Sequence, residues 1–245
     1  LFGVSDYFSN ISDNLIISLA QDNSGVFWLG SESKGAYIWD PSSELIKNYR
    51  YQQGKKESLS HNAVWTVQKH SHSEDLLWVG TSNGLNLIDH QQKSVARHLL
   101  ASGTESQFSD NNIYQVYNYN EESLLLTSKG VVFYNAKSNQ VITPGFDDEL
   151  WKVLAKEISS IFLQDERYLW LVQNDGVALI DLTLGQRIDL SPLNQVVPLT
   201  KIYHFLGSLP NSNAMLFSTN DSLWSYDLST HKAIKLYQHP GILAR

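Results

Sequence analysis

A short phrase recurs along this 245-residue chain at a nearly constant spacing. Each copy joins an apolar run, often containing tryptophan, to a turn and then to a second apolar run that ends in Asp or Asn. The closing residues are separated by 49, 46, 46 and 46 residues and are Asp40, Asp89, Asn135, Asp181 and Asp227. A period in the forties with tryptophan and turn residues at fixed offsets is typical of repeat proteins, most often of β-propeller blades.

Each repeat divides into four short extended segments separated by turn residues. In the second repeat we expect strands at 63–69, 76–81, 85–89 and 94–100. The Asn83-Gly84 pair predicts a type I′ hairpin turn, which needs positive φ at both central residues. The first strand of every repeat carries an apolar pair three residues apart, namely Ile16/Leu19, Val64/Val67, Ile113/Val116, Ile158/Ile161 and Ile202/Phe205.

The sequence therefore predicts an all-β chain, a β-propeller of four-stranded blades with about five repeats visible. We expect residues 1–11 to be the tail of a preceding blade, followed by repeats at about 12–59, 60–108, 109–154, 155–196 and 197–245. Because the chain starts at Leu1 without a methionine, we interpret it as an excerpt of a larger propeller. If the excerpt forms an open arc, its exposed edges would invite pairing with another copy, so a homodimer is one expectation.

Two further elements follow from the pattern. The tryptophans of the repeated phrase, with leucine in two repeats, should pack between neighbouring sheets; they are Trp28, Trp78, Leu124, Trp170 and Leu216. Phe146, Leu150, Trp151 and Leu154 fall at helical spacing around the acidic run 147–149, which favours a helix start electrostatically. We therefore expect a short helix between repeats three and four.

Composition excludes several classes of function. The formal charge is −7 without a compensating basic tract, whereas binding to a phosphate backbone needs clustered Lys and Arg, so we expect no nucleic-acid partner. The chain has no cysteine, which excludes disulfides and cysteine metal sites. No P-loop, dinucleotide fingerprint or Gly-x-Ser-x-Gly elbow occurs, so we expect no cofactor. His70 and His72 share a turn, which we interpret as solvated and not as a metal site.

One family shares this pattern. The segment from Val64 to Asp89 combines apolar-x-x-apolar, a turn, Trp-apolar-Gly-Thr, Gly-Leu-Asn and a closing Asp, and Ile16 to Asp40 is close to it. This pattern resembles the two-component regulator propeller repeat over residues 12 to 238. Repeats three to five keep the period but lose much of the signature.

The resemblance implies the extracytoplasmic sensor region of a bacterial hybrid histidine kinase or diguanylate cyclase. It implies a periplasmic location, as the outer part of an inner-membrane protein whose membrane span lies outside this sequence. The fragment itself would be non-catalytic, and its partner would be a small molecule or an oligosaccharide.

A second recurrence points to ligand contacts. Ser-x-Asn precedes the first strand at 12–14, 60–62 and 109–111, where entry loops commonly surround the central funnel of a propeller. Asparagine offers donors and acceptors, and adjoining aromatic rings can stack on sugars. The expected ligand-binding residues are Asn14, His61, Asn62, Trp65, Asn111, Tyr114 and Tyr203. The alternative is that Ser and Asn bond the local backbone and set the turn.

Two other functions stay open at this stage. A propeller lyase or glycoside-active enzyme would need an acid–base pair such as His61 with Asp13 or Asp110, drawn from neighbouring entry loops. An interaction scaffold of the WD40 kind suits the repeat length, but the recurring Gly-His and Trp-Asp phrases are missing; Trp39-Asp40 is a single instance.

Overall fold

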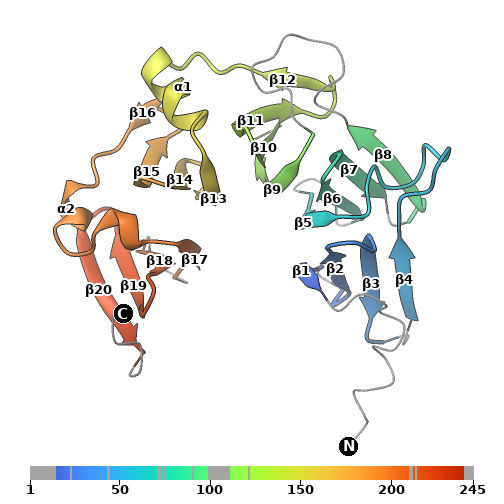
Figure 1. Ribbon diagram of the computed structural model, residues 1–245, viewed down its shortest axis with the longest axis horizontal. Helices are drawn as coiled ribbons and strands as arrows, with labels where there is room; N and C mark the ends of the chain where they lie inside the picture. Colours follow the sequence, from blue (N-terminus) through green and yellow to red (C-terminus); the bar gives the residue numbers. More distant parts are fainter. Residues whose placement is uncertain are drawn as a thin grey trace, which may run out of the picture. The chain divides into compact units, whose positions relative to one another are not determined.

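The computed structural model describes residues 15–22, 24–42, 45–70, 73, 75–89, 91–98, 111–120, 122–209, 212 and 214–239. The chain divides into two compact units, residues 1–143 and 144–245. Both units are built from four-stranded antiparallel sheets whose strands follow one another in sequence order (Figure 1). The expectation of an all-β chain made of four-stranded repeats is confirmed. The proposed domain boundaries at individual blades stay a prediction.

The first unit contains three sheets. They are formed by β1 (Ile16–Gln21), β2 (Phe27–Ser31), β3 (Ala36–Asp40) and β4 (Leu45–Tyr49); by β5 (Val64–Lys69), β6 (Leu76–Thr81), β7 (Gly84–Asp89) and β8 (Ser94–His98); and by β9 (Ile113–Tyr119), β10 (Glu122–Thr127), β11 (Gly130–Asn135) and β12 (Gln140–Ile142). The first strand of each sheet contacts the first strand of the next, β1 against β5 and β5 against β9 (Figure 1). The predicted strands of the second repeat match β5 to β8, except that residues 99 and 100 lie outside the described residues.

The described residues of the second unit form two sheets and three short helices. Its elements are α1 (Asp148–Leu154), β13 (Ile158–Gln164), β14 (Tyr168–Gln173), β15 (Gly176–Asp181), β16 (Gln186–Arg187), α2 (Ser191–Asn194), η2 (Leu199–Lys201), β17 (His204–Ser208), β18 (Ala214–Ser218), β19 (Ser222–Asp227) and β20 (Lys232–Gln238). Helix α1 confirms the predicted helix: Asp147 caps it by accepting the Leu150 N–H at 2.8 Å, and Leu150 and Leu154 are buried. The elements α2 and η2 were not predicted.

The closing Asp or Asn of each repeat sets the turn between the third and fourth strands. In each repeat its Oδ1 accepts a backbone N–H two or three residues further on, from Ser42, Gln92, Ser138, Thr183 and Ser229 respectively, at 2.8–3.0 Å. Four residues after the closing residue the backbone turns left-handed, at Lys93, Asn139, Gly185 and His231, with φ between 53° and 62°. The side chain of the recurring Asp or Asn therefore stabilises the turn by accepting a hydrogen bond from its backbone.

The turn between the second and third strands differs from the prediction. Only Gly84 has positive φ, at 115°, whereas Asn83 does not, so the expected type I′ turn is wrong. Thr81 pairs with Gly84, which makes Ser82-Asn83 the centre of the turn. The Thr81 hydroxyl accepts the Asn83 N–H at 3.1 Å and donates to the Gly84 carbonyl at 2.9 Å. The Thr side chain thus supplies the stabilisation that a type I′ backbone would otherwise give.

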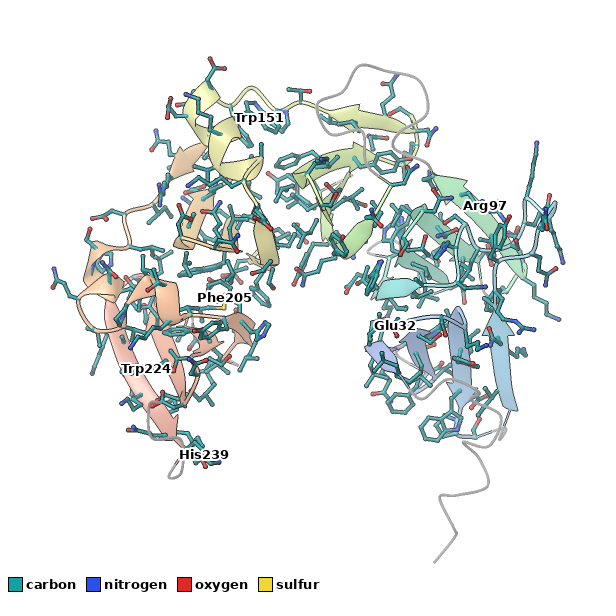
Figure 2. All side chains as sticks on the ribbon, viewed as in Figure 1. Glu32, Arg97, Trp151, Phe205, Trp224 and His239 are labelled. Atoms are coloured by element: carbon teal, nitrogen blue, oxygen red, sulfur yellow. The ribbon has the colours of Figure 1, made fainter. Side chains whose placement is uncertain are left out.

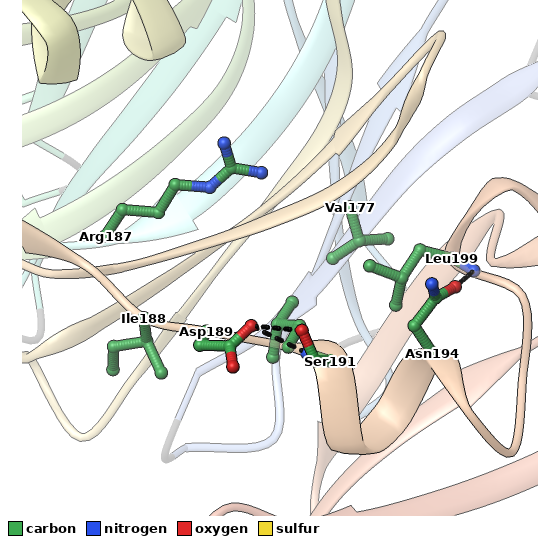
Figure 3. A pocket seen from close by; sticks show the side chains of 8 residues that line it. Val177, Arg187, Ile188, Asp189, Ser191, Asn194 and Leu199 are labelled. Atoms are coloured by element: carbon green, nitrogen blue, oxygen red, sulfur yellow. Dashed lines mark hydrogen bonds between the residues drawn. The ribbon is translucent and has the colours of Figure 1, made fainter.

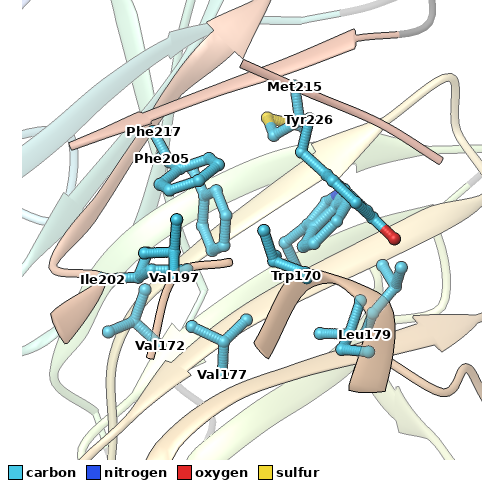
Figure 4. Close-up of a cluster of buried hydrophobic side chains, with 12 residues drawn as sticks. Trp170, Val172, Val177, Leu179, Val197, Ile202, Phe205, Met215, Phe217 and Tyr226 are labelled. Atoms are coloured by element: carbon cyan, nitrogen blue, oxygen red, sulfur yellow. The ribbon is translucent and has the colours of Figure 1, made fainter. Parts of the chain in front are cut away.

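The repeated tryptophans are buried, and Trp28 and Trp170 pack between neighbouring sheets as predicted, whereas Trp78 contacts His70 and His98 of its own repeat. Trp28, Trp78 and Trp170 are at most 1% exposed. In the second unit the Trp170 ring lies 5.1 Å from Phe205 and 6.3 Å from Tyr226, inside a cluster that joins both sheets (Figure 4). Leu124 is also buried, but Leu216 is only half-buried. Side chains alternate along a strand, and in β18 it is Met215 and Phe217 that join the cluster.

The connector between β4 and β5 is held in place by the outer strand of the second sheet. The Arg97 side chain in β8, labelled in Figure 2, donates to the carbonyls of Ser58 and Lys55 at 2.6 and 2.7 Å and to the Ser58 hydroxyl at 2.7 Å. Its guanidinium also lies 5.6 Å from the Tyr51 ring centroid. Charge-assisted bonds of this kind fix the path of the chain into the next blade.

Candidate ligand-binding site

The first strand of each sheet in the first unit (β1, β5 and β9) contains a β-bulge near its start. In β5 the register shifts between Val64 and Thr66, so Trp65 is the extra residue; in β9 the shift leaves out Tyr114. A bulge lets two residues oppose one on the partner strand and can redirect a side chain. It also explains the apolar pairs three apart, because with one residue inserted Val64 and Val67 share a face. Both are buried.

The two bulge residues form an aromatic pair. The rings of Trp65 and Tyr114 lie 5.8 Å apart with an angle of 61° between their planes. The Trp65 indole N–H donates to the Ser82 hydroxyl at 2.8 Å, and the Ser82 N–H donates to the Ala63 carbonyl at 3.1 Å. Tyr114 is 36% exposed and Trp65 is partly buried. The pair therefore presents fixed aromatic surface to solvent at the first strands of two neighbouring sheets.

The polar residues predicted beside this pair have structural partners. The Asn62 carbonyl accepts the Gly35 N–H, and its Oδ1 accepts the Tyr51 N–H, both at 2.8 Å. The Asn111 carbonyl accepts the Gly84 N–H at 2.5 Å. An equivalent Gly-to-Asn backbone hydrogen bond therefore links both pairs of consecutive sheets in the first unit. Of these three bonds only the one from Tyr51 uses an asparagine side chain, and Tyr51 lies 11 residues earlier, so the bonds join the entry loops to the preceding repeat instead of closing a local turn.

The serine of the motif is also built into the fold. Ser60 is buried, its N–H donates to Asn86 Oδ1 at 2.9 Å, and its hydroxyl lies 2.9 Å from the Thr81 hydroxyl. This network accounts for the asparagine of the Gly-Leu-Asn phrase, which is otherwise an unusual residue to bury. His61, between Ser60 and Asn62, is exposed, and its Nδ1 accepts the Ala63 N–H at 3.0 Å. Of the motif at 60–62, Ser60 is buried, Asn62 is half-buried and His61 is exposed.

The two other predicted residues, Asn14 and Tyr203, do not belong to the described part of the first unit. Asn14 lies outside the described residues. Tyr203 belongs to the second unit, is 40% exposed, and precedes β17, with its N–H donating to the Ser218 carbonyl at 3.1 Å. The Ile202/Phe205 pair is accordingly not a pair within one strand, because Ile202 ends η2 and only Phe205 lies in β17. The ligand role of all seven residues stays a prediction.

The described residues carry neither a metal-binding cluster nor a membrane-spanning helix. Within them, no group of three or more His, Asp or Glu residues is placed to hold a metal ion. His70 packs its ring 5.3 Å from Trp78, while His72 lies outside the described residues. None of the described helices has the length and hydrophobicity to cross a membrane.

Comparison with known families gives one match. A family model described as "Two component regulator propeller" matches residues 10–33, in the first repeat. This confirms the resemblance for that segment. No curated protein matches the sequence.

Solved structures match nearly the whole chain. The extracellular domain described as that of the hybrid two component system BT3049 from B. thetaiotaomicron has a TM-score of 0.72 and 14% identity, covering 93% of this chain and 30% of that one. PorZ, a surface component of the type-IX secretion system of Porphyromonas gingivalis, has a TM-score of 0.66 and 9% identity, covering 93% and 28%. The extracellular domain described as that of the one component system BT4673 from B. thetaiotaomicron has a TM-score of 0.50 and 20% identity, covering 92% and 36%.

These matches show the fold. The five four-stranded antiparallel sheets are those of part of a β-propeller, like the extracellular domains of two-component systems, so the predicted fold class is confirmed. The chain spans between 28% and 36% of the length of these three solved chains.

Proposed function

We propose that this chain is the ligand-sensing propeller region of a membrane-bound bacterial signalling protein, a hybrid histidine kinase or a diguanylate cyclase. It would lie in the periplasm, be non-catalytic itself, and reach the membrane through other parts of the parent chain. The observation that carries the proposal is the fold match to the BT3049 extracellular domain, together with the regulator-propeller match at residues 10–33.

We further propose that the ligand is an oligosaccharide that contacts Trp65 and Tyr114. Aromatic rings offer apolar surface to the C–H faces of sugars, and ligand sites combine such surface with a few polar groups. The exposed His61 imidazole supplies a polar group in the loop that leads into β5, the strand of Trp65. Because the Ser82 bond and the ring contact hold Trp65 in one orientation, little side-chain entropy is lost on binding.

Calorimetric titration of the chain with a panel of bacterial, plant and host oligosaccharides tests this site. We expect Trp65→Ala to weaken binding of a positive glycan by about tenfold or more, as is common for a buried aromatic anchor. Trp224→Ala removes a partly exposed tryptophan in the second unit and should leave the affinity unchanged (Figure 2). Equal affinities for the two variants would show that the aromatic pair is not the site.

The enzyme alternative has no supporting geometry, because Asp13 and Asp110 both lie outside the described residues. It would be favoured if the chain turned over a polysaccharide and the His61→Ala variant did not.

A further inference from the structure

The second unit contains a pocket of about 410 Å³ between the sheet of β13–β16 and the connector that follows it, residues 188–203 (Figure 3). Val177 of β15 and Arg187 of β16 line it from the sheet, and Asp189, Asn194 and Leu199 line it from the connector. This volume is within the usual range for small-molecule sites, roughly 300–1,000 Å³. The pocket exists because β16 is only two residues long, after which the chain leaves the sheet edge.

The connector wall is anchored in the core. Leu190, Leu193 and Val197 are at most 5% exposed and belong to the buried cluster around Trp170. The Val197 N–H donates to the Leu193 carbonyl at 2.9 Å. These buried side chains hold the connector backbone against the core. This wall of the pocket is therefore in place before a ligand binds, which lowers the entropic cost of binding.

The pocket carries two opposite charges that do not neutralise each other. Among the described residues, the Arg187 guanidinium has neither a salt bridge nor a hydrogen bond. Asp189 uses Oδ1 to accept the N–H and the hydroxyl of Ser191, at 2.9 and 2.6 Å, and no described residue bonds its Oδ2. The same Ser191 bonds hold the pKa of Asp189 below its usual value, so the carboxylate is ionised at neutral pH.

The remaining lining supplies a donor and an apolar wall. Asn194 Oδ1 accepts the Leu199 N–H at 3.2 Å, which leaves its amide N–H groups as donors. Val177 lies at the base of the pocket and is buried in the core, whereas Leu199 is half-buried and presents aliphatic surface to the pocket. A purely anionic ligand would be repelled by Asp189, and a purely cationic one by Arg187, whereas a zwitterion would be attracted by both.

We propose that this pocket binds a free α-amino acid with an aliphatic side chain. Arg187 holds the carboxylate, Asp189 holds the ammonium group, and Leu199 contacts the side chain. The proposal rests on the pocket alone and is independent of the sensory function proposed for the aromatic pair.

Isothermal titration calorimetry of the 245-residue chain with L-leucine tests it. Two probes each lack one charge: 4-methylpentanoate has no ammonium group, and leucinamide has no carboxylate. Both should bind at least about tenfold more weakly than leucine, since a hydrogen bond to a charged group is usually worth a factor of that order. Arg187→Gln and Asp189→Asn should each weaken leucine binding to a similar degree.

Lys152→Gln is the matched control, because it removes an exposed positive charge in α1 of the same unit. It should leave leucine binding unchanged, and thermal unfolding of each variant checks that the fold is intact. The proposal is overturned if leucine releases no binding heat at millimolar concentration, if either probe binds as tightly as leucine, or if Arg187→Gln and Asp189→Asn bind leucine like the wild type.

Discussion

His98 at the end of β8 is placed where a positive charge would be unfavourable. Its Nδ1 lies 2.8 Å from the Tyr134 hydroxyl, which itself donates to Asn139 Oδ1. Its Nε2 is buried and has no hydrogen-bond partner among the described residues. Burial lowers the pKa of His98 below its usual value. The neutral ring fits this network, whereas the protonated ring would bury an N–H without an acceptor.

The first unit should therefore lose stability in mild acid. In the unfolded chain His98 takes up a proton below about pH 6.5, whereas the folded chain resists it, so stability is complete above that pH and falls below it. The loss from one such group is at most about 1.4 kcal/mol per pH unit. Urea unfolding at pH 7.5 and 5.5 measures it, and His98→Gln should show a smaller difference between the two pH values.

His204→Gln, which changes an exposed histidine in β17, should keep the wild-type pH difference. If His98→Gln kept it as well, the burial of His98 would not be its cause.

At the scale of elements, the glycine of the Trp-apolar-Gly phrase allows neighbouring sheets to approach. A Cβ added at Gly80 in β6 would lie 2.6 Å from Thr66 Cγ2 and 2.7 Å from the Ile113 carbonyl oxygen of β9. At Gly30 in β2 it would lie 2.7 Å from a methyl group of Val64 in β5. Equivalent glycines in two repeats thus allow the close approach at both contacts between sheets in the first unit.

Gly80→Ala should destabilise the chain by about 1–3 kcal/mol, the usual cost of overpacking. Gly145→Ala is the matched control, because a Cβ there would have no other atom within 4 Å, so its free energy of unfolding should be near that of the wild type. Chemical denaturation of both variants measures the difference. Similar midpoints for Gly80→Ala and Gly145→Ala would contradict the close approach.

Elements with a local chemical signal were predictable from sequence. Asp89 indicated the end of β7, because its carboxylate accepts a backbone N–H of the turn that follows. Asp147 indicated the start of α1, because its side chain caps that helix. The bulge at Trp65 was visible only as an unexplained spacing of three. The short α2 gave no helical period, since four residues with Pro192 in the first turn cannot show one. The connector pocket, which depends on it, was consequently missed.

At the scale of the whole molecule, the repeat gives equivalent residues different surroundings. Val67 and Leu19 hold the same position in consecutive repeats. Val67 is 5% exposed because the sheet of β5–β8 packs against that of β1–β4, whereas Leu19 in β1 is 62% exposed. Burial in a propeller therefore depends on the neighbouring blade as well as on the position within the repeat.

Val67→Asp should destabilise the first unit by about 3 kcal/mol or more, because it buries an unpaired carboxylate. Leu19→Asp should change the stability of this chain by less than about 1 kcal/mol, as at other exposed positions. Urea unfolding of the two variants compares them directly. An equal loss for Leu19→Asp would show that the face of β1 is covered in solution.

The sensory role depends most on what the parent gene encodes around this region. Sequencing its complete reading frame on both sides is the most direct measurement. The account predicts further propeller repeats, a membrane span, and a histidine kinase or diguanylate cyclase domain in the same polypeptide. A complete gene product with neither a membrane span nor a signalling domain would contradict it.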